Sequence, residues 1–207
     1  MKRPALPLTD QAHAALAAAL RPGDLAIDAT CGFGRDTLFL ARAVGAHGRV
    51  LAMDVQGVAV EKTRSALAAA SLSGVADVIL RSHADLRQVV PADWHGRVGA
   101  VTFNLGYLPG GDHVITTTWR ETGPALMVAT DLLRPGGVLT VIAYTGHPGG
   151  ADEKDGVERE LRLLDPEKWV LEVHQPEKGR RSPPWLYTVR RIGGNRPCND
   201  APPYRAC

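Results

Sequence analysis

A glycine-containing loop and a later aspartate form the first candidate site in this sequence. The loop, Asp28-Ala29-Thr30-Cys31-Gly32-Phe33-Gly34, lies between a short apolar segment and a helical pattern. Gly32 and Gly34 lack a Cβ, so the backbone there can approach a ligand closely. Asp54 ends the next apolar segment, where a carboxylate can accept hydrogen bonds from both hydroxyls of a ribose. The pattern predicts a nucleoside-binding site.

The sequence of the loop narrows the class of nucleoside. A dinucleotide site needs a third small residue where this chain has Thr37, and the lysine of a P-loop is also absent. The spacing D-x-x-x-G-x-G instead resembles motif I of class I S-adenosylmethionine (SAM) methyltransferases, whose cofactor carries a sulfonium and no phosphate. Asp28, Asp54 and Asp85 follow successive strand-like segments, which favours cofactor binding over three separate helix caps.

The elements that must position these residues alternate between short strands and helices. Apolar periodicity predicts helices over 10–20, 36–44, 58–70, 119–133 and 152–164. Strands are predicted over 25–27, 50–53, 78–80, 98–103, 138–143, 169–173 and 185–189. The segment Arg134–Gly137 is expected to close the helix before it. The alternation predicts an α/β, Rossmann-like fold: a seven-stranded, mostly parallel sheet with an antiparallel last strand and helices on both faces.

Length and composition indicate one domain. The chain has 207 residues, is 44% hydrophobic and carries a net charge of +2, which suits a single domain over 1–192 and a flexible tail over 193–207. No apolar stretch reaches the ~20 residues of a membrane helix. Cys31, Cys198 and Cys207 form no C-x-x-C pair, so neither a disulfide framework nor a metal site is expected. We expect a cytoplasmic protein.

The most distinctive segment is Phe103-Asn104-Leu105-Gly106-Tyr107-Leu108-Pro109-Gly110-Gly111-Asp112. Together with Asp36-Thr37-Leu38-Phe39-Leu40-Ala41, Asp54-Val55-Gln56 and Tyr144-Thr145-Gly146-His147-Pro148-Gly149-Gly150, it closely resembles the MnmM (YtqB-like) family. The resemblance covers about residues 24–189. It implies a class I methyltransferase that uses SAM to N-methylate the aminomethyl group of 5-aminomethyl-(2-thio)uridine at the tRNA wobble position. The product is the 5-methylaminomethyl form.

This resemblance and the residue chemistry together assign the candidate site. The residues expected to bind the cofactor are Asp28, Thr30, Gly32, Gly34, Asp36, Thr37, Asp54, Gln56, His83, Asp85, Asn104 and Leu105. Those expected near the methyl-accepting nitrogen are Asn104, Tyr107, Asp112 and His147, with His147 as the hypothesised proton acceptor because histidine titrates near neutral pH. The expected RNA contacts are Tyr144, Lys178, Arg180, Arg181 and Trp185, since phosphate charge and base stacking hold single-stranded anticodon loops.

Further residues are weighed for a role in the site. Trp119 also offers a face for base stacking, whereas His13, His47 and His95 are expected on the surface without a role. The family's Gly-His-Glu after the third strand reads Ser82-His83-Ala84-Asp85 here, which moves the adenine-side acidic contact to Asp85 or removes it. Its Asn-Gln near the final hairpin reads His174-Gln175.

Other functions stay open beside the implied one. They are a SAM-dependent methyltransferase acting on rRNA or on a small-molecule amine, a non-catalytic SAM- or RNA-binding module, and a nicotinamide oxidoreductase. Thr37 disfavours the oxidoreductase, because a third glycine or alanine belongs at that place. The expected partner is the anticodon stem-loop of tRNA, and a homodimer is a further option.

Overall fold

The structure is a computed structural model that describes residues 6–174 and 182–193. The predicted RNA contacts Lys178, Arg180 and Arg181 lie outside these residues, as does the predicted tail from residue 194 onward.

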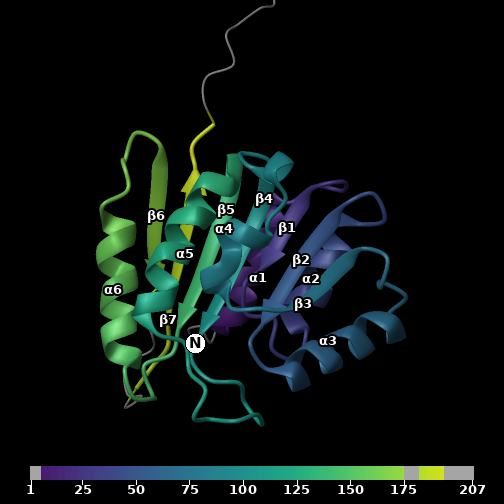
Figure 1. Ribbon diagram of the computed structural model, residues 1–207. Helices are drawn as coiled ribbons and strands as arrows, with labels where there is room; N and C mark the ends of the chain where they lie inside the picture. Colours follow the sequence, from purple (N-terminus) through teal and green to yellow (C-terminus); the bar gives the residue numbers. More distant parts are fainter. Residues whose placement is uncertain (1–5, 175–181, 194–207) are drawn as a thin grey trace, which may run out of the picture.

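The described residues form one seven-stranded sheet (Figure 1). The strands are β1 (Leu25–Asp28), β2 (Arg49–Asp54), β3 (Ala76–Leu80), β4 (Val98–Leu105), β5 (Leu133–Ala143), β6 (Trp169–His174) and β7 (Trp185–Arg191). Their order is β3-β2-β1-β4-β5-β7-β6. The first five strands are parallel, and β7 pairs antiparallel with both β5 and β6. The predicted Rossmann-like sheet with an antiparallel last strand is confirmed.

Helices cover both faces of the sheet, as predicted. They are α1 (Leu8–Ala19), α2 (Arg35–Val44), α3 (Gly57–Ala69), α4 (Leu86–Val89), α5 (Trp119–Leu132) and α6 (Gly150–Arg162), with short 3₁₀ turns at His83–Asp85 and Ala92–Trp94. Figure 1 shows α4, α5 and α6 on the near face. Two apolar clusters result. One packs α4, α5 and α6 on one face, and the other packs α1, α2 and α3 on the opposite face. In the described residues, no helix is long and apolar enough to cross a membrane.

The start of β5 differs from the prediction. The strand begins at Leu133, which pairs with Val98, and not at Val138. The register shifts before the Val138–Ala100 pair, so the segment Arg134–Gly137 is an irregularity within the strand and not a loop that closes α5. Arg134 stabilises this course because its guanidinium donates to Asp24 Oδ2 at 2.7 Å and to the Ala19 carbonyl at 2.8 Å. The sequence Arg-Pro-Gly-Gly signals a turn, but these tertiary contacts outweigh it.

The packing of α5 against α6 depends on a glycine. A Cβ on Gly156 would lie 2.3 Å from Cδ2 of Trp119. We therefore expect Gly156→Ala to lower the free energy of unfolding by about 1–3 kcal/mol. This clash outweighs the higher helix propensity of alanine, which by itself would stabilise the helix by about 1 kcal/mol. Urea denaturation measures this change. Gly57→Ala is the matched control, because Gly57 lies in a helix with open space around it. Equal stability of Gly156→Ala and wild type would contradict this packing.

Candidate functional site

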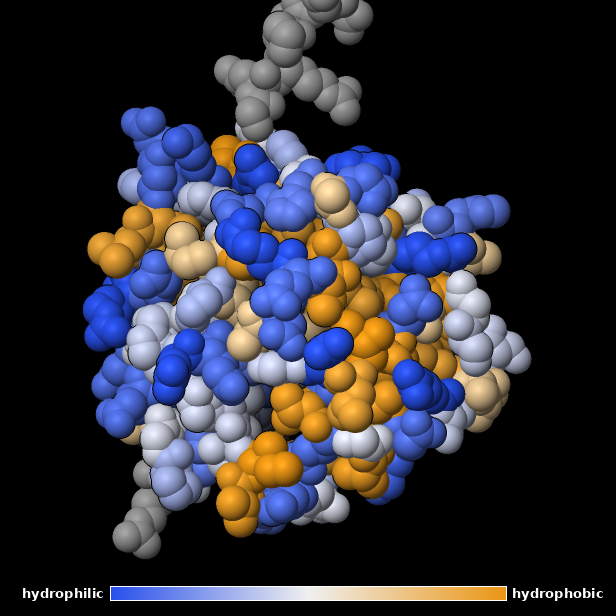
Figure 2. All heavy atoms as spheres, in the orientation of Figure 1, coloured by the Kyte–Doolittle hydropathy of each residue, from blue (hydrophilic) through white to orange (hydrophobic). Residues whose placement is uncertain are grey.

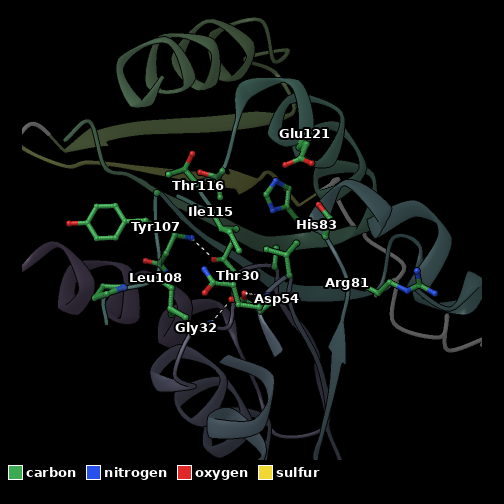
Figure 3. A pocket seen from close by; sticks show the side chains of 18 residues that line it. Thr30, Gly32, Asp54, Arg81, His83, Tyr107, Leu108, Ile115, Thr116 and Glu121 are labelled. Atoms are coloured by element: carbon green, nitrogen blue, oxygen red, sulfur yellow. Dashed lines mark hydrogen bonds between the residues drawn. The ribbon is translucent and has the colours of Figure 1, made fainter. Parts of the chain in front are cut away.

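The carboxyl ends of β1 to β4 meet at one edge of the sheet and enclose a cavity there (Figure 3). Parallel α/β sheets bind ligands at this edge. This cavity is the smaller of two that adjoin each other. The residues that line it and were predicted to bind the cofactor or to lie near the reacting nitrogen are Thr30, Gly32, Asp54, Gln56, His83, Asn104 and Tyr107. They come from four separate segments of sequence, and the topology of the sheet brings them together.

Asp54 is the main carboxylate of this cavity. Its Oδ2 accepts a hydrogen bond from the Gly32 N–H at 3.0 Å, and its Oδ1 accepts one from the Gln56 N–H at 2.9 Å. A carboxylate oxygen can accept more than one hydrogen bond, so both oxygens retain acceptor capacity toward the cavity. The side chain thus fixes the glycine loop and also offers the paired acceptors that ribose hydroxyls require.

Asp28 and Thr37 lie beneath the loop and line neither cavity of the site. Asp28 is fully buried, and its carboxylate accepts from the Thr37 hydroxyl at 2.6 Å and from the Thr30 N–H at 3.3 Å. Burial, with the nearby charge of Asp36, raises the pKa of Asp28 to about 7. These two residues therefore position Thr30 and the start of α2, and the expected direct contact with a cofactor stays a prediction.

A second and larger cavity adjoins the first. It is lined by Asp36, Tyr144 and Arg35 among others, and it shares Thr30, Gly32, Asn104 and the segment Gly106–Pro109 with the smaller one. Its volume is about 460 Å³, against about 120 Å³ for the smaller cavity. Two ligands held in these cavities would meet at the shared wall, where Asn104 lies.

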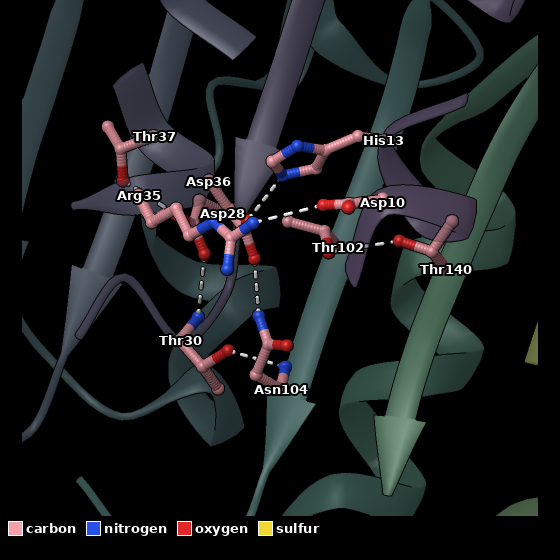
Figure 4. Close-up of polar contacts among 10 residues, drawn as sticks. All are labelled: Asp10, His13, Asp28, Thr30, Arg35, Asp36, Thr37, Thr102, Asn104 and Thr140. Atoms are coloured by element: carbon pink, nitrogen blue, oxygen red, sulfur yellow. Dashed lines mark hydrogen bonds and ion pairs between the residues drawn. The ribbon is translucent and has the colours of Figure 1, made fainter. Parts of the chain in front are cut away.

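The side chain of Asn104 is held in one orientation by Asp36 (Figure 4). Its Nδ2 donates to Asp36 Oδ2 at 2.6 Å, and its backbone N–H donates to the Thr30 hydroxyl at 2.7 Å. An ionised carboxylate only accepts hydrogen bonds, so the amide must turn its nitrogen toward Asp36. The Oδ1 of Asn104 is consequently left as an acceptor at the junction of the two cavities.

His13 completes this network, although sequence reasoning gave it no role. Its Nε2 lies 2.6 Å from Asp36 Oδ1, and its ring stacks on Phe39 with the centroids 4.0 Å apart. Burial alone would raise the pKa of Asp36, but hydrogen bonds from His13 and Asn104 hold it below its usual value. Asp36 is therefore a charged carboxylate in the wall of the larger cavity. The spacing of His13 on an alanine-rich helix holds no signal of this contact, which is set by where α1 packs.

We expect His13→Ala to lower kcat for methyl transfer about tenfold. Asp36 would lose the hydrogen-bond donor that fixes its orientation, and the side chain of Asn104 would then be positioned less precisely. The dissociation constant of S-adenosylhomocysteine, measured by calorimetry, should stay unchanged. His13→Gln retains a donor and should recover most of the activity. His47→Ala serves as the control for an exposed histidine. Equal kcat for His13→Ala and wild type would exclude the role of this contact.

The other residues predicted near the reacting nitrogen divide into two groups. Tyr107 lines both cavities, and Tyr144, which was predicted as an RNA contact, lines the larger one. Burial, followed by the charge of Asp36, raises the pKa of Tyr144, so its hydroxyl stays a donor. Asp112 and His147 line neither cavity. Asp112 caps the loop after β4 by accepting from the Val114 N–H at 2.9 Å.

The geometry around His147 does not favour the hypothesised proton acceptor. Its Nδ1 contacts the Pro148 carbonyl at 3.0 Å, and its Nε2 is buried without a hydrogen-bond partner among the described residues. In place of His147, the larger cavity has the carboxylate of Asp36 in its wall. The role of His147 as proton acceptor stays a prediction.

Three further predicted cofactor contacts lie outside the lining of both cavities. Leu105 is fully buried in the core, and Asp85 lies in the turn after His83. Gly34 directly precedes α2 with φ +85°, and a Cβ there would lie 3.0 Å from the Thr63 hydroxyl. The structure thus explains Gly34 by the close packing of the loop on α3, whereas the sequence predicted that it contacts the cofactor.

The tryptophans predicted to stack on RNA bases pack within the protein. Trp119 begins α5 and packs against Gly123 and Gly156, but it is only partly buried, so base stacking by this residue stays a prediction. Trp185 packs against the core, and the ammonium of Lys154 lies 4.4 Å from its ring centroid.

Similarity to known proteins agrees with this geometry. The family described as "Putative rRNA methylase" matches residues 50–190. A relative from Arabidopsis thaliana, named tRNA (mnm(5)s(2)U34)-methyltransferase, chloroplastic, is 39% identical over 170 residues, and the match covers 78% of this chain. The chain spans 61% of the length of that relative.

Two solved structures share nearly the whole fold. A protein from Clostridium thermocellum, titled as a putative rRNA-methylase, has a TM-score of 0.86 and 35% identity, over 92% of this chain and 100% of that one. SMU.1697c, a putative methyltransferase from Streptococcus mutans in complex with SAH, has a TM-score of 0.79 and 31% identity, over 93% of this chain and 99% of that one. These relatives confirm the resemblance to the MnmM (YtqB-like) family. The chain belongs to the family described as "Putative rRNA methylase", a family of SAM-dependent methyltransferases.

Proposed function

We propose that this protein transfers the methyl group of SAM to the aminomethyl nitrogen of 5-aminomethyl-(2-thio)uridine at the wobble position of tRNA. The observation that carries the proposal is Asn104, whose side chain is oriented by Asp36 at the junction of the two adjoining cavities. The name of the Arabidopsis relative supports the same substrate.

The residues of the smaller cavity fit SAM better than a phosphate-bearing cofactor. Its charged lining residues are Asp54, Glu121 and Arg81, so carboxylates outnumber basic groups, as suits a cationic donor without phosphate. Asp54 would hold the ribose hydroxyls, and Gly32 would allow close approach to the loop. When bound, SAM supplies an electrophilic methyl group.

Asn104 and Asp36 supply what methyl transfer to an amine requires. An amine accepts a methyl group through its lone pair, so it must react in its neutral form. The Oδ1 of Asn104 can accept an amine N–H and thereby aim that lone pair across the shared wall. The nitrogen gains positive charge as the bond forms, and the charged carboxylate of Asp36 stabilises that charge.

The described surface beside the larger cavity suits an unpaired, charged nucleic acid. Arg35 lines the cavity, and Lys62 lies 3.9 Å from the ring centroid of Phe33 at the same wall. The loop after β4 exposes Val114 and Ile115, and Ile115 lines the adjoining smaller cavity. Figure 2 shows apolar side chains gathered right of the centre of this face and again at its lower edge. Cations for phosphates next to apolar side chains for bases are what single-stranded RNA contacts require.

The test is methylation of tRNA that lacks the wobble methyl group. Bulk tRNA from cells blocked at this last step is incubated with SAM and the purified protein, and its nucleosides are then identified by mass spectrometry. Conversion of 5-aminomethyl-uridine or its 2-thio form to the methylaminomethyl nucleoside is expected, and Asn104→Ala should slow it by about 10²- to 10³-fold. Methylation of rRNA or of a small amine with no conversion of tRNA would overturn the proposed substrate. Salt separates these cases, because RNA binding weakens steeply with ionic strength.

Three finer points accompany the proposal. A cytoplasmic location and a homodimer stay predictions, as does binding of the anticodon stem-loop by Lys178, Arg180 and Arg181.

A further inference from the structure

A buried polar chain leads from the cofactor cavity to the interior of the α5–α6 packing. His83 follows β3 and lines the smaller cavity, while only 5% of its surface is exposed. Its Nε2 lies 3.1 Å from the hydroxyl of Thr122. That hydroxyl donates to Glu153 Oε1 at 2.6 Å, and Thr117 donates to Glu153 Oε2 at 2.6 Å. Thr122 and Glu153 are both buried.

Glu153 determines which group donates and which accepts in this series of hydrogen-bonded side chains. Both of its oxygens lie at the distance typical of a hydroxyl bound to an ionised carboxylate, and such a carboxylate only accepts. Burial raises the pKa of Glu153, while the two hydroxyls oppose that shift. Because the Thr122 hydrogen is directed to Glu153, its oxygen can only accept from His83, and Nε2 must bear the hydrogen.

The second nitrogen of His83 is then an acceptor. Burial lowers the pKa of His83 to about 4, so the ring is neutral near pH 7 and Nδ1 carries a lone pair. Among the described residues, His147 Nε2 is the one buried side-chain nitrogen or oxygen that lacks a partner. Nδ1 of His83 also has no hydrogen-bond partner among these residues. Since it is not among the fully buried atoms without a partner, it must be accessible, and the accessible space beside the ring is the cavity that His83 lines.

We propose that Glu153 and Thr122 lock His83 in its Nε2–H tautomer, so that Nδ1 selects a cofactor base bearing an amino group. This inference rests on the proposed use of SAM. With the ribose on Asp54 at the end of β2, the base extends toward the end of β3, which is where His83 lies. The exocyclic amine of adenine donates to an acceptor there, whereas hypoxanthine has a carbonyl at that place. His83 determines specificity, and Thr122 and Glu153 are positioning residues that do not touch the cofactor.

The tautomer is observed directly by ¹⁵N NMR. Protonated and bare ring nitrogens of histidine resonate far apart, and loss of one signal set in His83→Gln assigns the residue. We expect a protonated Nε2 and a bare Nδ1 for His83 in the wild-type protein. Thr122→Val should produce a mixture of both tautomers, and Thr122→Ser should retain the wild-type spectrum. An Nδ1–H tautomer in the wild-type protein would overturn the proposal, whether or not the variants fold.

Base selection is measured with two product analogues. Calorimetry with wild-type protein should give about tenfold tighter binding of S-adenosylhomocysteine than of S-inosylhomocysteine, as expected for one hydrogen bond. Thr122→Val should bind the two compounds about equally, and Thr122→Ser should discriminate as wild type does. Equal binding of both by wild type would overturn base selection by His83 and leave the proposed function intact. Failure to bind either compound would overturn the proposed use of SAM itself.

Discussion

Replacing Asn104 by alanine is expected to lower kcat for tRNA methylation by about 10²- to 10³-fold, the usual effect of deleting a polar group that acts in the transition state. The variant loses the oxygen that orients the amine and leaves Asp36 with one donor fewer. Cofactor affinity should change little, because Asp54 and the glycine loop are unaltered. Single-turnover methylation measures the chemical step, and calorimetry with S-adenosylhomocysteine measures binding.

Asn104→Asp is the informative companion to the alanine variant. It keeps the size and one oxygen, but it places a second carboxylate against Asp36, and like charges at that distance repel. The variant should be as inactive as Asn104→Ala near pH 7. Turnover within about threefold of wild type for Asn104→Ala would exclude Asn104 from the reaction.

Replacing Asp54 by alanine is expected to weaken S-adenosylhomocysteine binding by 10²-fold or more. The side chain accepts from Gly32 and Gln56 and has acceptor capacity left for the ribose, and hydrogen bonds to a charged group are worth about 1.5–3 kcal/mol each. Removing the carboxylate both deletes the ribose contact and releases the loop. Calorimetry measures the dissociation constant.

Asp77→Ala provides the control for charge removal, since Asp77 is an exposed aspartate on the neighbouring strand. It should bind S-adenosylhomocysteine as wild type does. Thermal unfolding of both variants without ligand separates a loss of affinity from a loss of stability. An unchanged dissociation constant in Asp54→Ala would show that the ribose is held elsewhere.

The polar residues at strand ends were predictable because strand pairing fixes their place. Once the apolar segments are recognised as parallel strands, one edge of the sheet must bring together Thr30, Asp54, His83 and Asn104. This holds for any conformation of the connecting loops. Periodicity and spacing contain this information. The same reasoning fails for β5, where the Arg-Pro-Gly-Gly signal of a turn is overridden by pairing with β4 and by the contacts of Arg134.

The contacts that orient these residues could not be predicted, because they join segments through helix packing. His13 reaches Asp36 only because α1 lies across β5 and β7 beside the start of α2. Thr122 reaches His83 only because α5 packs on the turn after β3. The sequence predicts which face of each helix is apolar. It does not predict how far the helix is rotated about its axis or shifted along it when that face packs on the sheet. Roles read from motifs alone, such as that of His147, depend on the same unknown.

The place of β7 in the sheet has a consequence for folding during synthesis. Of the described strands, β7 leaves the ribosome last, yet it lies between β5 and β6 and is the strand with which β6 pairs. Until β7 emerges, the hydrogen-bonding edge of β5 is open along an almost wholly buried, apolar strand. Exposed edges of this kind pair with other chains. We therefore expect nascent chains that stop before Trp185 to aggregate, and the insertion of β7 to be the step that closes the sheet.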